Sequence, residues 1–551
     1  MKSAGQEAVI AGVIAWYAAV YLIVRPLADA PVIDGWIYSH AVRLFAATGR
    51  LRFAGFTEAM PAAQVLYGAA WGRLFGASEV SLDLSVACLG AIGAILLYPL
   101  LIRCGAGRAE AAIASGLLVA NPCYLFLSFS FMTDIPFLVL TIAAMLAFAK
   151  AEPPSGSFWL WVCTLLSIAA FMIRPFAAAA IAGFAGAAII CDLRAYKLDR
   201  RWLKRAANRL APFCFAAAAC AAVWTWLMVM QARPWRLEHR ARLVGYFFTV
   251  GVATYIRAGI LGPLLYLGIV LSPLAILQLA AAGVRRAAGI VATIFIAVWT
   301  LIRLDPKPPA TPELSCFGGW SNALLLRGLP THFEWQGAGN WIAVALGSAG
   351  AAGLIVAVRH AWPRLNRAGA AMVIAAACYW AAMIPLWLFN DRYYLFLVPA
   401  AASILALTPI RSQRRALPAA IALTAIMGIA SAAGLYDYQR GLGAVIAARD
   451  ALEREGVPRP QIDAGYSLNG ADLYHFADQA QAEESFEREQ GIPMITSSAL
   501  DEYTIAAAPI AGTEIVRRLD WPGVCGSARR TLYVLRRRDV TSAPGKSSPA
   551  K

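Results

Sequence analysis

Residues 84–102 read LSVACLGAIGAILLYPLLI, a run without one charged side chain. A helix rises about 1.5 Å per residue, so about 20 apolar residues cross the hydrocarbon core of a bilayer. Comparable runs recur up to residue 435 of the 551, and 60% of all residues are hydrophobic while 15% are charged. Soluble chains hold about half apolar and about a quarter charged residues. The sequence therefore predicts an α-helical polytopic membrane protein.

About thirteen membrane-spanning helices are expected from these runs. The first follows Lys2 without a small-residue cleavage site, which favours an uncleaved span over a signal peptide. Arg174-Pro175 predicts a tight turn near a membrane face, because proline ends a helix and a buried arginine is costly. The predicted spans lie at 8–27, 84–102, 110–128, 135–149, 158–173, 175–191, 211–230, 260–281, 288–303, 341–358, 369–389, 394–410 and 417–435.

Short loops rich in arginine set the predicted orientation. With an odd number of spans these loops fall on one side, which the positive-inside rule assigns to the cytoplasm. The N-terminus is then cytoplasmic, and the C-terminus lies outside with long loops at 28–83, 231–259 and 304–340. We expect an integral, multi-pass protein of the cell (inner) membrane. The basic loops hold Arg103 and Arg108; Arg194 to Arg209; Arg285 and Arg286; Arg359, Arg364 and Arg367; and Arg411, Arg414 and Arg415.

The chain divides into a transmembrane domain at 1–435 and a soluble tail. The tail, at 436–541, is predicted to be a small α/β domain outside the membrane. Residues 542–551 are rich in Ser, Pro and Lys and are predicted to be disordered. Within the tail, the patterns predict a helix at Gly443–Gly456 and strands at 461–468, 503–509, 514–519 and 531–535.

Net charge and the positions of cysteine and histidine limit which partners and metal sites are expected. The net charge of +16 comes from the membrane part, where basic residues face lipid phosphate, and no nucleic-acid motif is present. Membrane lipids are therefore expected partners and nucleic acid is not. The ten cysteines form no CxxC pair and the five histidines are scattered, so no metal site is predicted. Cys316 and Cys525 both fall outside, where they either form a disulfide or remain free.

Two aspartates lie where a reaction site is expected. Asp34 follows the first span within APVIDGWIY, residues 30–38, and suits a general base at the mouth of the bundle. Asp134, within FMTDIP at 131–136, is expected at the same face and could line the same cavity. Each aspartate also fits a simpler role, because Asp caps helix N-termini well and Thr or Asp before Pro begins helices.

Arginines are predicted at the same face as these acids. NDRYY, residues 390–394, joins two spans there, and Arg392 with Tyr393 is a candidate for binding a lipid phosphate. The alternative is an Asp–Arg pair with tyrosines at a membrane surface. Arg174 is expected nearby.

The long loop at 231–259 adds Arg236 and Arg240, which either bind anionic groups or lie at headgroup level. Converging acids and arginines suit transfer from a lipid phosphate. The acid takes a proton from the attacking group, and the arginines stabilise the departing phosphate.

This layout resembles the GT-C superfamily of membrane glycosyltransferases, which includes the protein O-mannosyltransferases and the lipid A aminoarabinose transferase. The resemblance implies a large first outer loop and a soluble C-terminal domain outside, where AGYSLNG at 464–470 is similar to a segment of such domains. The motifs it implies are an acid soon after the first span, matched by Asp34; an Asp opening a later helix, matched by Thr133-Asp134; an Arg-Pro, matched by Arg174-Pro175; and an Arg-Tyr pair opening a late span, matched by Arg392-Tyr393.

Two features depart from the superfamily pattern. Asp34 is followed by Gly35 where many relatives have Asp-Glu, and Met60-Pro61-Ala62-Ala63 stands where many have a double proline. Glu58 is a candidate second acid. These departures leave the metal requirement and the acceptor open.

The hypothesis is an inverting glycosyltransferase that moves a sugar from a polyprenyl-phosphate donor to a lipid, glycan or protein acceptor. Asp34 would be the base, and Asp134 would orient the acceptor or support Asp34. The donor carries a good leaving group, so no cofactor is required, although a divalent metal remains compatible. The rival hypothesis is a transporter or lipid flippase, which predicts charged or broken helices near mid-membrane and internal repeats. The sequence shows neither.

Overall fold

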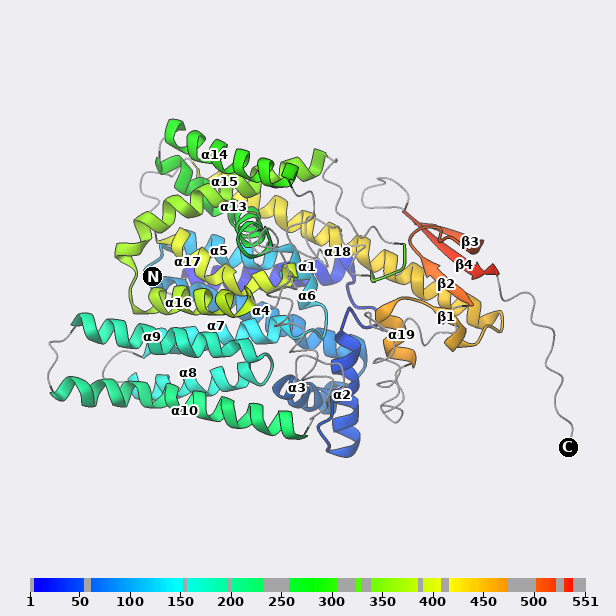
Figure 1. Ribbon diagram of the computed structural model, residues 1–551, viewed down its shortest axis with the longest axis horizontal. Coiled ribbons are helices and arrows are strands. Elements are labelled where there is room, and N and C mark those ends of the chain that lie inside the picture. The colour runs from blue at the N-terminus through cyan, green and yellow to red at the C-terminus, as the bar shows by residue number, and fades with distance from the viewer. Residues whose placement is uncertain are drawn as a thin grey trace, which may run out of the picture.

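Helices dominate the described part of the chain, and most of them lie side by side in one bundle (Figure 1). The N-terminus lies at one end of this bundle, and a small sheet lies beyond the other end. The computed structural model describes residues 4–53, 61–151, 156–195, 200–230, 257–282, 284–304, 324–328, 338–384, 390–407, 416–473, 502–521 and 530–538.

The helices of the first half are α1 (Ala4–Val24), α2 (Gly35–Thr48), α3 (Ala62–Phe75), α4 (Glu79–Cys104), α5 (Arg108–Ala120), α6 (Pro122–Ser128), α7 (Asp134–Lys150), α8 (Gly156–Phe171), η1 (Pro175–Ala177), α9 (Ala178–Ala195) and α10 (Arg200–Met230). Those of the second half are η2 (Arg257–Leu261), α13 (Gly262–Ala282), α14 (Val284–Leu304), α15 (Ala338–Ala361), η4 (Trp362–Arg364), α16 (Arg367–Met383), η6 (Asp391–Leu397), α17 (Val398–Ala406), α18 (Leu417–Arg454), η8 (Arg459–Gln461) and α19 (Tyr466–Leu473).

Six helices in the described residues are long and apolar enough to cross a membrane: α1, α4, α10, α13, α15 and α18. A seventh span results if the bent pair of α5 and α6 counts as one. The multi-pass α-helical class is therefore confirmed, but the predicted number of thirteen is not. The other predicted spans either form shorter apolar helices or fall short of this test.

The span predicted at 110–128 is not one straight helix. It breaks at Asn121, and α5 and α6 meet there at 62°. The side chain of Asn121 accepts hydrogen bonds from the backbone N–H groups of Cys123 and Tyr124, at 2.9 and 3.2 Å. Pro122 removes one donor from the new helix, so capping by Asn and the proline together fix the bend.

Small residues allow a close helix crossing between α13 and α15. Gly268 on α13 faces Gly347 and Gly350 on α15 so closely that a β-carbon at Gly350 would strike the backbone of Gly268. Close approach through small residues is how helices associate in lipid, where little hydrophobic driving force acts between them.

The bundle continues into the tail through α18. This helix runs without a break past residue 435, so the predicted span at 417–435 and the predicted helix at 443–456 are one element. Gly456, with φ +89°, follows its end, as expected for a glycine at that position. Figure 1 shows α18 leading from the bundle towards the sheet.

The tail contains a four-stranded sheet in the order β1-β2-β4-β3. Its strands are β1 (Ile462–Asp463), β2 (Tyr503–Ala506), β3 (Thr513–Trp521) and β4 (Arg530–Arg537). β1 lies parallel to β2, and the β2–β4 and β4–β3 pairs are antiparallel. Three predicted strands are therefore confirmed. The strand predicted at 461–468 is wrong beyond Asp463, because Gly465 at φ +87° turns the chain into α19.

Two segments from the membrane part lie at the tail end of the bundle. Figure 1 shows α2 and α3 there, with α2 running across the direction of the main bundle. Farther along the chain, Arg327 forms a bridge with Ala506 of β2, and its guanidinium pairs with buried Asp463 at 2.7 Å. The tail is therefore attached through side-chain and backbone contacts as well as through α18.

Candidate active site

Asp34 sits between the bundle and the tail. It occupies the N-cap position of α2, but its side chain makes no capping hydrogen bond. The phenol of Tyr466 donates to its Oδ1 at 2.9 Å, and Nη2 of Arg392 lies 3.4 Å from its Oδ2. The carboxylate therefore joins a residue of the tail to one of a late bundle segment, and the capping interpretation of Asp34 is wrong.

Arg392 lies in the short helix η6, which is buried among aromatic rings. The phenol of Tyr379 donates to the carbonyl of Tyr393 at 3.0 Å, and the Tyr379 ring stacks on Phe396 with centroids 4.2 Å apart. The Arg392 side chain is 8% exposed against 25% for Asp34. Asn390 and Asp391 are buried as well, which is not the arrangement of an exposed surface pair.

Arg174 makes a second acid–arginine pair. Its Nη2 lies 2.9 Å from Oδ2 of Asp134, and its Nε donates to the hydroxyl of Thr133 at 2.8 Å. Thr133 stands at the N-cap of α7 but makes no side-chain capping bond. The predicted turn at Arg174-Pro175 is present between α8 and η1. A two-point grip of this kind fixes the guanidinium plane.

Tyr393 connects the two pairs. The Cζ atoms of Arg174 and Arg392 lie 5.7 and 5.6 Å from the centroid of its ring. Both distances are within the range of cation–π attraction. Arginines that would otherwise repel one another are thus held near one aromatic ring.

Tyr38 lies one helical turn beyond Asp34 and is buried. Burial raises the pKa of its phenol, and the carboxylate of Asp34 raises the pKa further, while Arg174 and Arg392 act in the opposite direction. Burial, followed by the charge of Asp34, likewise raises the pKa of Tyr466 well above its usual value. Both phenols therefore keep their protons over the physiological range.

Helix α3 supports the segments that carry Asp134 and Arg174. The buried amide of Gln64 donates to the carbonyl of Phe131 at 3.0 Å, and the backbone N–H of Ala63 donates to the carbonyl of Met172 at 3.2 Å. Helix α3 thus holds the segments just before Asp134 and just before Arg174.

The structure brings together Asp34, Asp134, Arg174, Arg392 and Tyr393. The predicted Glu58, Arg236, Arg240, Cys316 and Cys525 lie outside the described residues. Tyr466 and Tyr38 were missed as site residues by sequence reasoning. Tyr466 is part of the quoted AGYSLNG segment. A strand was predicted there, whereas the segment begins helix α19, which places the Tyr466 side chain against Asp34.

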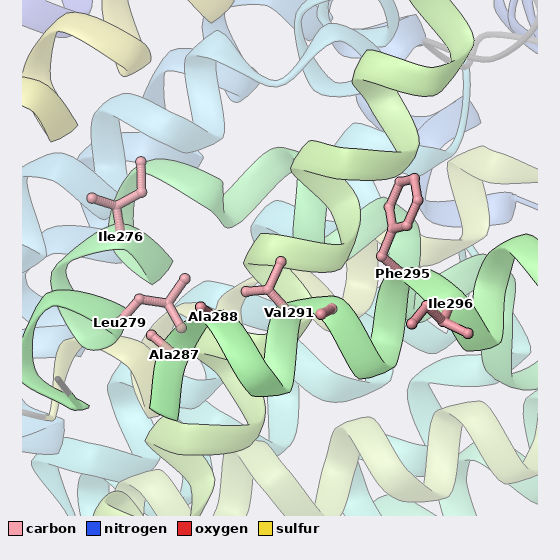
Figure 2. A pocket seen from close by; sticks show the side chains of 8 residues that line it. Ile276, Leu279, Ala287, Ala288, Val291, Phe295 and Ile296 are labelled. Atoms are coloured by element: carbon pink, nitrogen blue, oxygen red, sulfur yellow. The ribbon is translucent and has the colours of Figure 1, made fainter. Parts of the chain in front are cut away.

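The described residues contain no cluster of metal ligands, and a pocket among them is apolar. No group of three or more His, Cys, Asp or Glu side chains lies close enough there to hold a metal ion. A pocket of about 630 Å³ lies between α13 and α14, and hydrocarbon side chains line it (Figure 2). None of the predicted site residues is among its lining residues.

One protein-family model matches a segment of the chain. Residues 67–216 match the family model described as dolichyl-phosphate-mannose-protein mannosyltransferase. This segment includes Asp134 and Arg174. The match confirms the predicted resemblance to the GT-C superfamily of membrane glycosyltransferases. A search of curated proteins finds no match.

Three solved structures are similar in part. ArnT from Cupriavidus metallidurans is 16% identical, with a TM-score of 0.41, over 95% of this chain and 98% of that chain. The archaeal oligosaccharyltransferase AglB from Archaeoglobus fulgidus is 17% identical, with a TM-score of 0.45, over 89% of this chain and 60% of that chain. A chain of the Pmt1-Pmt2 complex of S. cerevisiae is 18% identical, with a TM-score of 0.34, over 41% of this chain and 34% of that chain. These identities and TM-scores are low, so none of the three bears on this chain's function.

Proposed function

We propose that the protein is an inverting glycosyltransferase that moves a sugar from a polyprenyl-phosphate donor to an acceptor at the outer face of the membrane. The observation that supports this proposal most directly is the contact between Asp34 and Arg392. A candidate base and a candidate phosphate ligand, 358 residues apart in sequence, meet at one end of the bundle. The family match over 67–216 supports the same reaction class.

The reaction breaks one bond to the anomeric carbon and forms another. Asp34 takes the proton from an acceptor hydroxyl, whose oxygen attacks the anomeric carbon from the face opposite the phosphate. The bond from that carbon to the phosphate oxygen breaks, and its electron pair leaves with the phosphate. Attack from the opposite face inverts the configuration at this carbon.

Arg392 and Arg174 stabilise the departing phosphate, because guanidinium groups match its oxygens in two-point contacts. The Asp34–Arg392 contact at 3.4 Å is longer than the Asp134–Arg174 contact at 2.9 Å. The donor phosphate can therefore displace Asp34 from Arg392 and leave the carboxylate free to accept a proton. Asp134 keeps Arg174 in place during this exchange.

The proposed orientation places the N-terminus in the cytoplasm and the tail outside. The N-terminus and the tail lie at opposite ends of the bundle, as this orientation requires (Figure 1). The site faces the tail, so a donor anchored in the outer leaflet reaches it from the bilayer, and a lipid, glycan or protein acceptor reaches it from outside.

The test is transfer or release of sugar from a panel of labelled polyprenyl-phosphate sugars, with an extract of envelope lipids, glycans and proteins as acceptor. Wild type is compared with Asp34→Asn, and Asp450→Asn serves as a control on α18, where Asp450 pairs with Arg449. Loss of the general base should lower turnover about 100-fold or more, and the control should match wild type. Each protein is assayed without metal and with Mg²⁺ or Mn²⁺, which decides the metal requirement.

Equal turnover by wild type and Asp34→Asn would remove Asp34 from the mechanism. A wild type that turns over no donor in the presence of this acceptor extract would contradict the transferase and favour the transporter. The donor that is turned over identifies the sugar.

A further inference from the structure

The tail contributes a side chain to the site through α19. The phenol of Tyr466 donates to Oδ1 of Asp34 at 2.9 Å, while Oδ2 of the same carboxylate faces Arg392. We propose that Tyr466 is a positioning residue for the transfer reaction, which fixes the carboxylate of Asp34 so that one defined oxygen is presented to the acceptor. This inference rests on the proposed function of Asp34 as the base.

The backbone beside Asp34 is held by the same helix. Ile33 has φ +50°, a left-handed conformation that is an outlier for a β-branched residue and costs free energy. The hydroxyl of Ser467 donates to the carbonyl of Ile33 at 3.2 Å, and the turn is closed by a bond from the N–H of Gly35 to the carbonyl of Val32 at 2.8 Å. Strained backbone persists only where its surroundings hold it, so α19 fixes both the main chain and the side chain of the acid.

Helix α19 is itself rigidly placed. Buried Asp463 accepts hydrogen bonds from the N–H of Gly465 at 3.0 Å and from the side-chain amide of Asn469 at 2.8 Å. The amide oxygen of Asn469 accepts in turn from the N–H of Ala464 at 2.9 Å. This network ties the start of the helix to β1. Because α19 is held in this way, the phenol of Tyr466 can fix the position of the Asp34 carboxylate.

The phenol acts as a donor and does not take up the reaction's proton. Burial, and then the charge of Asp34, raises the pKa of Tyr466, which keeps its proton in place. The acceptor's proton therefore goes to the carboxylate of Asp34. Tyr466 contacts the acid, and Arg392 and Arg174 remain the proposed ligands of the donor phosphate.

The ring of Tyr466 can be separated from its hydroxyl by substitution. It packs edge-on against fully buried Trp36 with centroids 6.1 Å apart. Tyr466→Phe keeps this ring contact and removes the hydroxyl that donates to Asp34. Tyr436 offers a matched control, because its hydroxyl also makes a side-chain hydrogen bond, to Arg440 at an exposed part of α18.

The experiment measures kcat and the donor KM for wild type, Tyr466→Phe and Tyr436→Phe on the donor that wild type turns over. Tyr466→Phe should lower kcat about 10- to 100-fold, which is the effect expected from losing one hydrogen bond to a charged group. The donor KM should stay within about twofold, because the phosphate ligands are untouched. Tyr436→Phe should match wild type. In an Asp34→Asn background, Tyr466→Phe should change the residual rate by less than about twofold, because the effect acts through Asp34.

The failures of the two proposals are distinguishable. A wild type without turnover overturns the proposed function and the inference with it. An active wild type with an equally active Tyr466→Phe overturns the positioning role alone. A Tyr466→Phe variant that raises the donor KM at unchanged kcat, or that lowers the rate equally in the Asp34→Asn background, also overturns it, because the residue would then act on donor binding or on folding.

Discussion

At the scale of single residues, the acids near the tail end of the bundle have partners that local sequence does not indicate. Asp34 stands at the N-cap of α2 and Asp134 is the first residue of α7, yet each carboxylate faces a guanidinium instead of capping its helix. Asp134 is 4% exposed, so its charge depends on Arg174. Removing one partner of a buried pair leaves an uncompensated charge, whereas removing both partners does not.

Arg174→Ala should therefore destabilise the protein strongly. We expect a loss of about 3–5 kcal/mol in the free energy of unfolding, measured by denaturation of the purified protein in detergent. Adding Asp134→Asn in the same chain should recover part of the loss, because the orphaned charge is removed.

Arg517→Ala is the control for this pair. Arg517 and Glu455 form an ion pair at 2.6 Å with both side chains at least one-third exposed. Such a pair contributes about 0–1 kcal/mol. If Arg174→Ala proved no more destabilising than Arg517→Ala, the charge of Asp134 would not depend on Arg174.

At the scale of elements, the contact between α19 and α2 joins the tail to the first loop. Gly470 of α19 lies directly on the indole of Trp36, and the ring of His40 contacts the carbonyl of Ala471 at 3.2 Å. A β-carbon at Gly470 would strike the indole, which is fully buried and has no room to move. The absence of a side chain at this position is thus a condition for the contact.

Gly470→Ala should separate α19 from α2. Overpacking of this kind costs about 1–3 kcal/mol, which the free energy of unfolding would report. Transfer activity should fall as well, because Tyr466 moves with α19. Gly443→Ala, in α18 with open space around the new β-carbon, should instead stabilise by about 0.5–1 kcal/mol. Unchanged stability and activity in Gly470→Ala would show that the two helices do not pack this tightly.

At the scale of the whole molecule, the bundle has two distinct ends. The tail, α2 and α3 lie at one end, and the N-terminus lies at the other (Figure 1). Basic residues such as Arg359 and Arg364 lie in the last turn of α15 and in η4. The proposed orientation, with the N-terminus in the cytoplasm, is the one that the positive-inside rule predicts.

Cysteine labelling of intact cells should report this orientation. Glu514 on β3 and Arg364 in η4 are both exposed, so a cysteine at either position is accessible to a reagent on its own side. A membrane-impermeant maleimide should label Glu514→Cys above the wild-type signal and leave Arg364→Cys at that signal. Permeabilised cells should label both. The reverse pattern would place the tail in the cytoplasm.

The sequence by itself determined the class of the protein. Hydropathy is a property of each residue and its near neighbours, so apolar runs such as 84–102 indicate membrane helices without knowledge of their packing. The same local patterns found three strands of the tail and the turn at Arg174-Pro175. They did not determine the number of spans, because Asn121 breaks one apolar run and other runs are too short for their length alone to decide.

Only the tertiary structure decided which groups meet. Asp34 lies 358 residues from Arg392 and 432 from Tyr466, and no local pattern encodes a pairing over such separations. AGYSLNG is short and mixed in character, so local propensity was overridden by the left-handed turn at Gly465 and the hydrogen bonds of Asp463. The acids and arginines could be predicted one by one from their positions beside spans. Their union into a single site depends on how the helices, the first loop and the tail pack together.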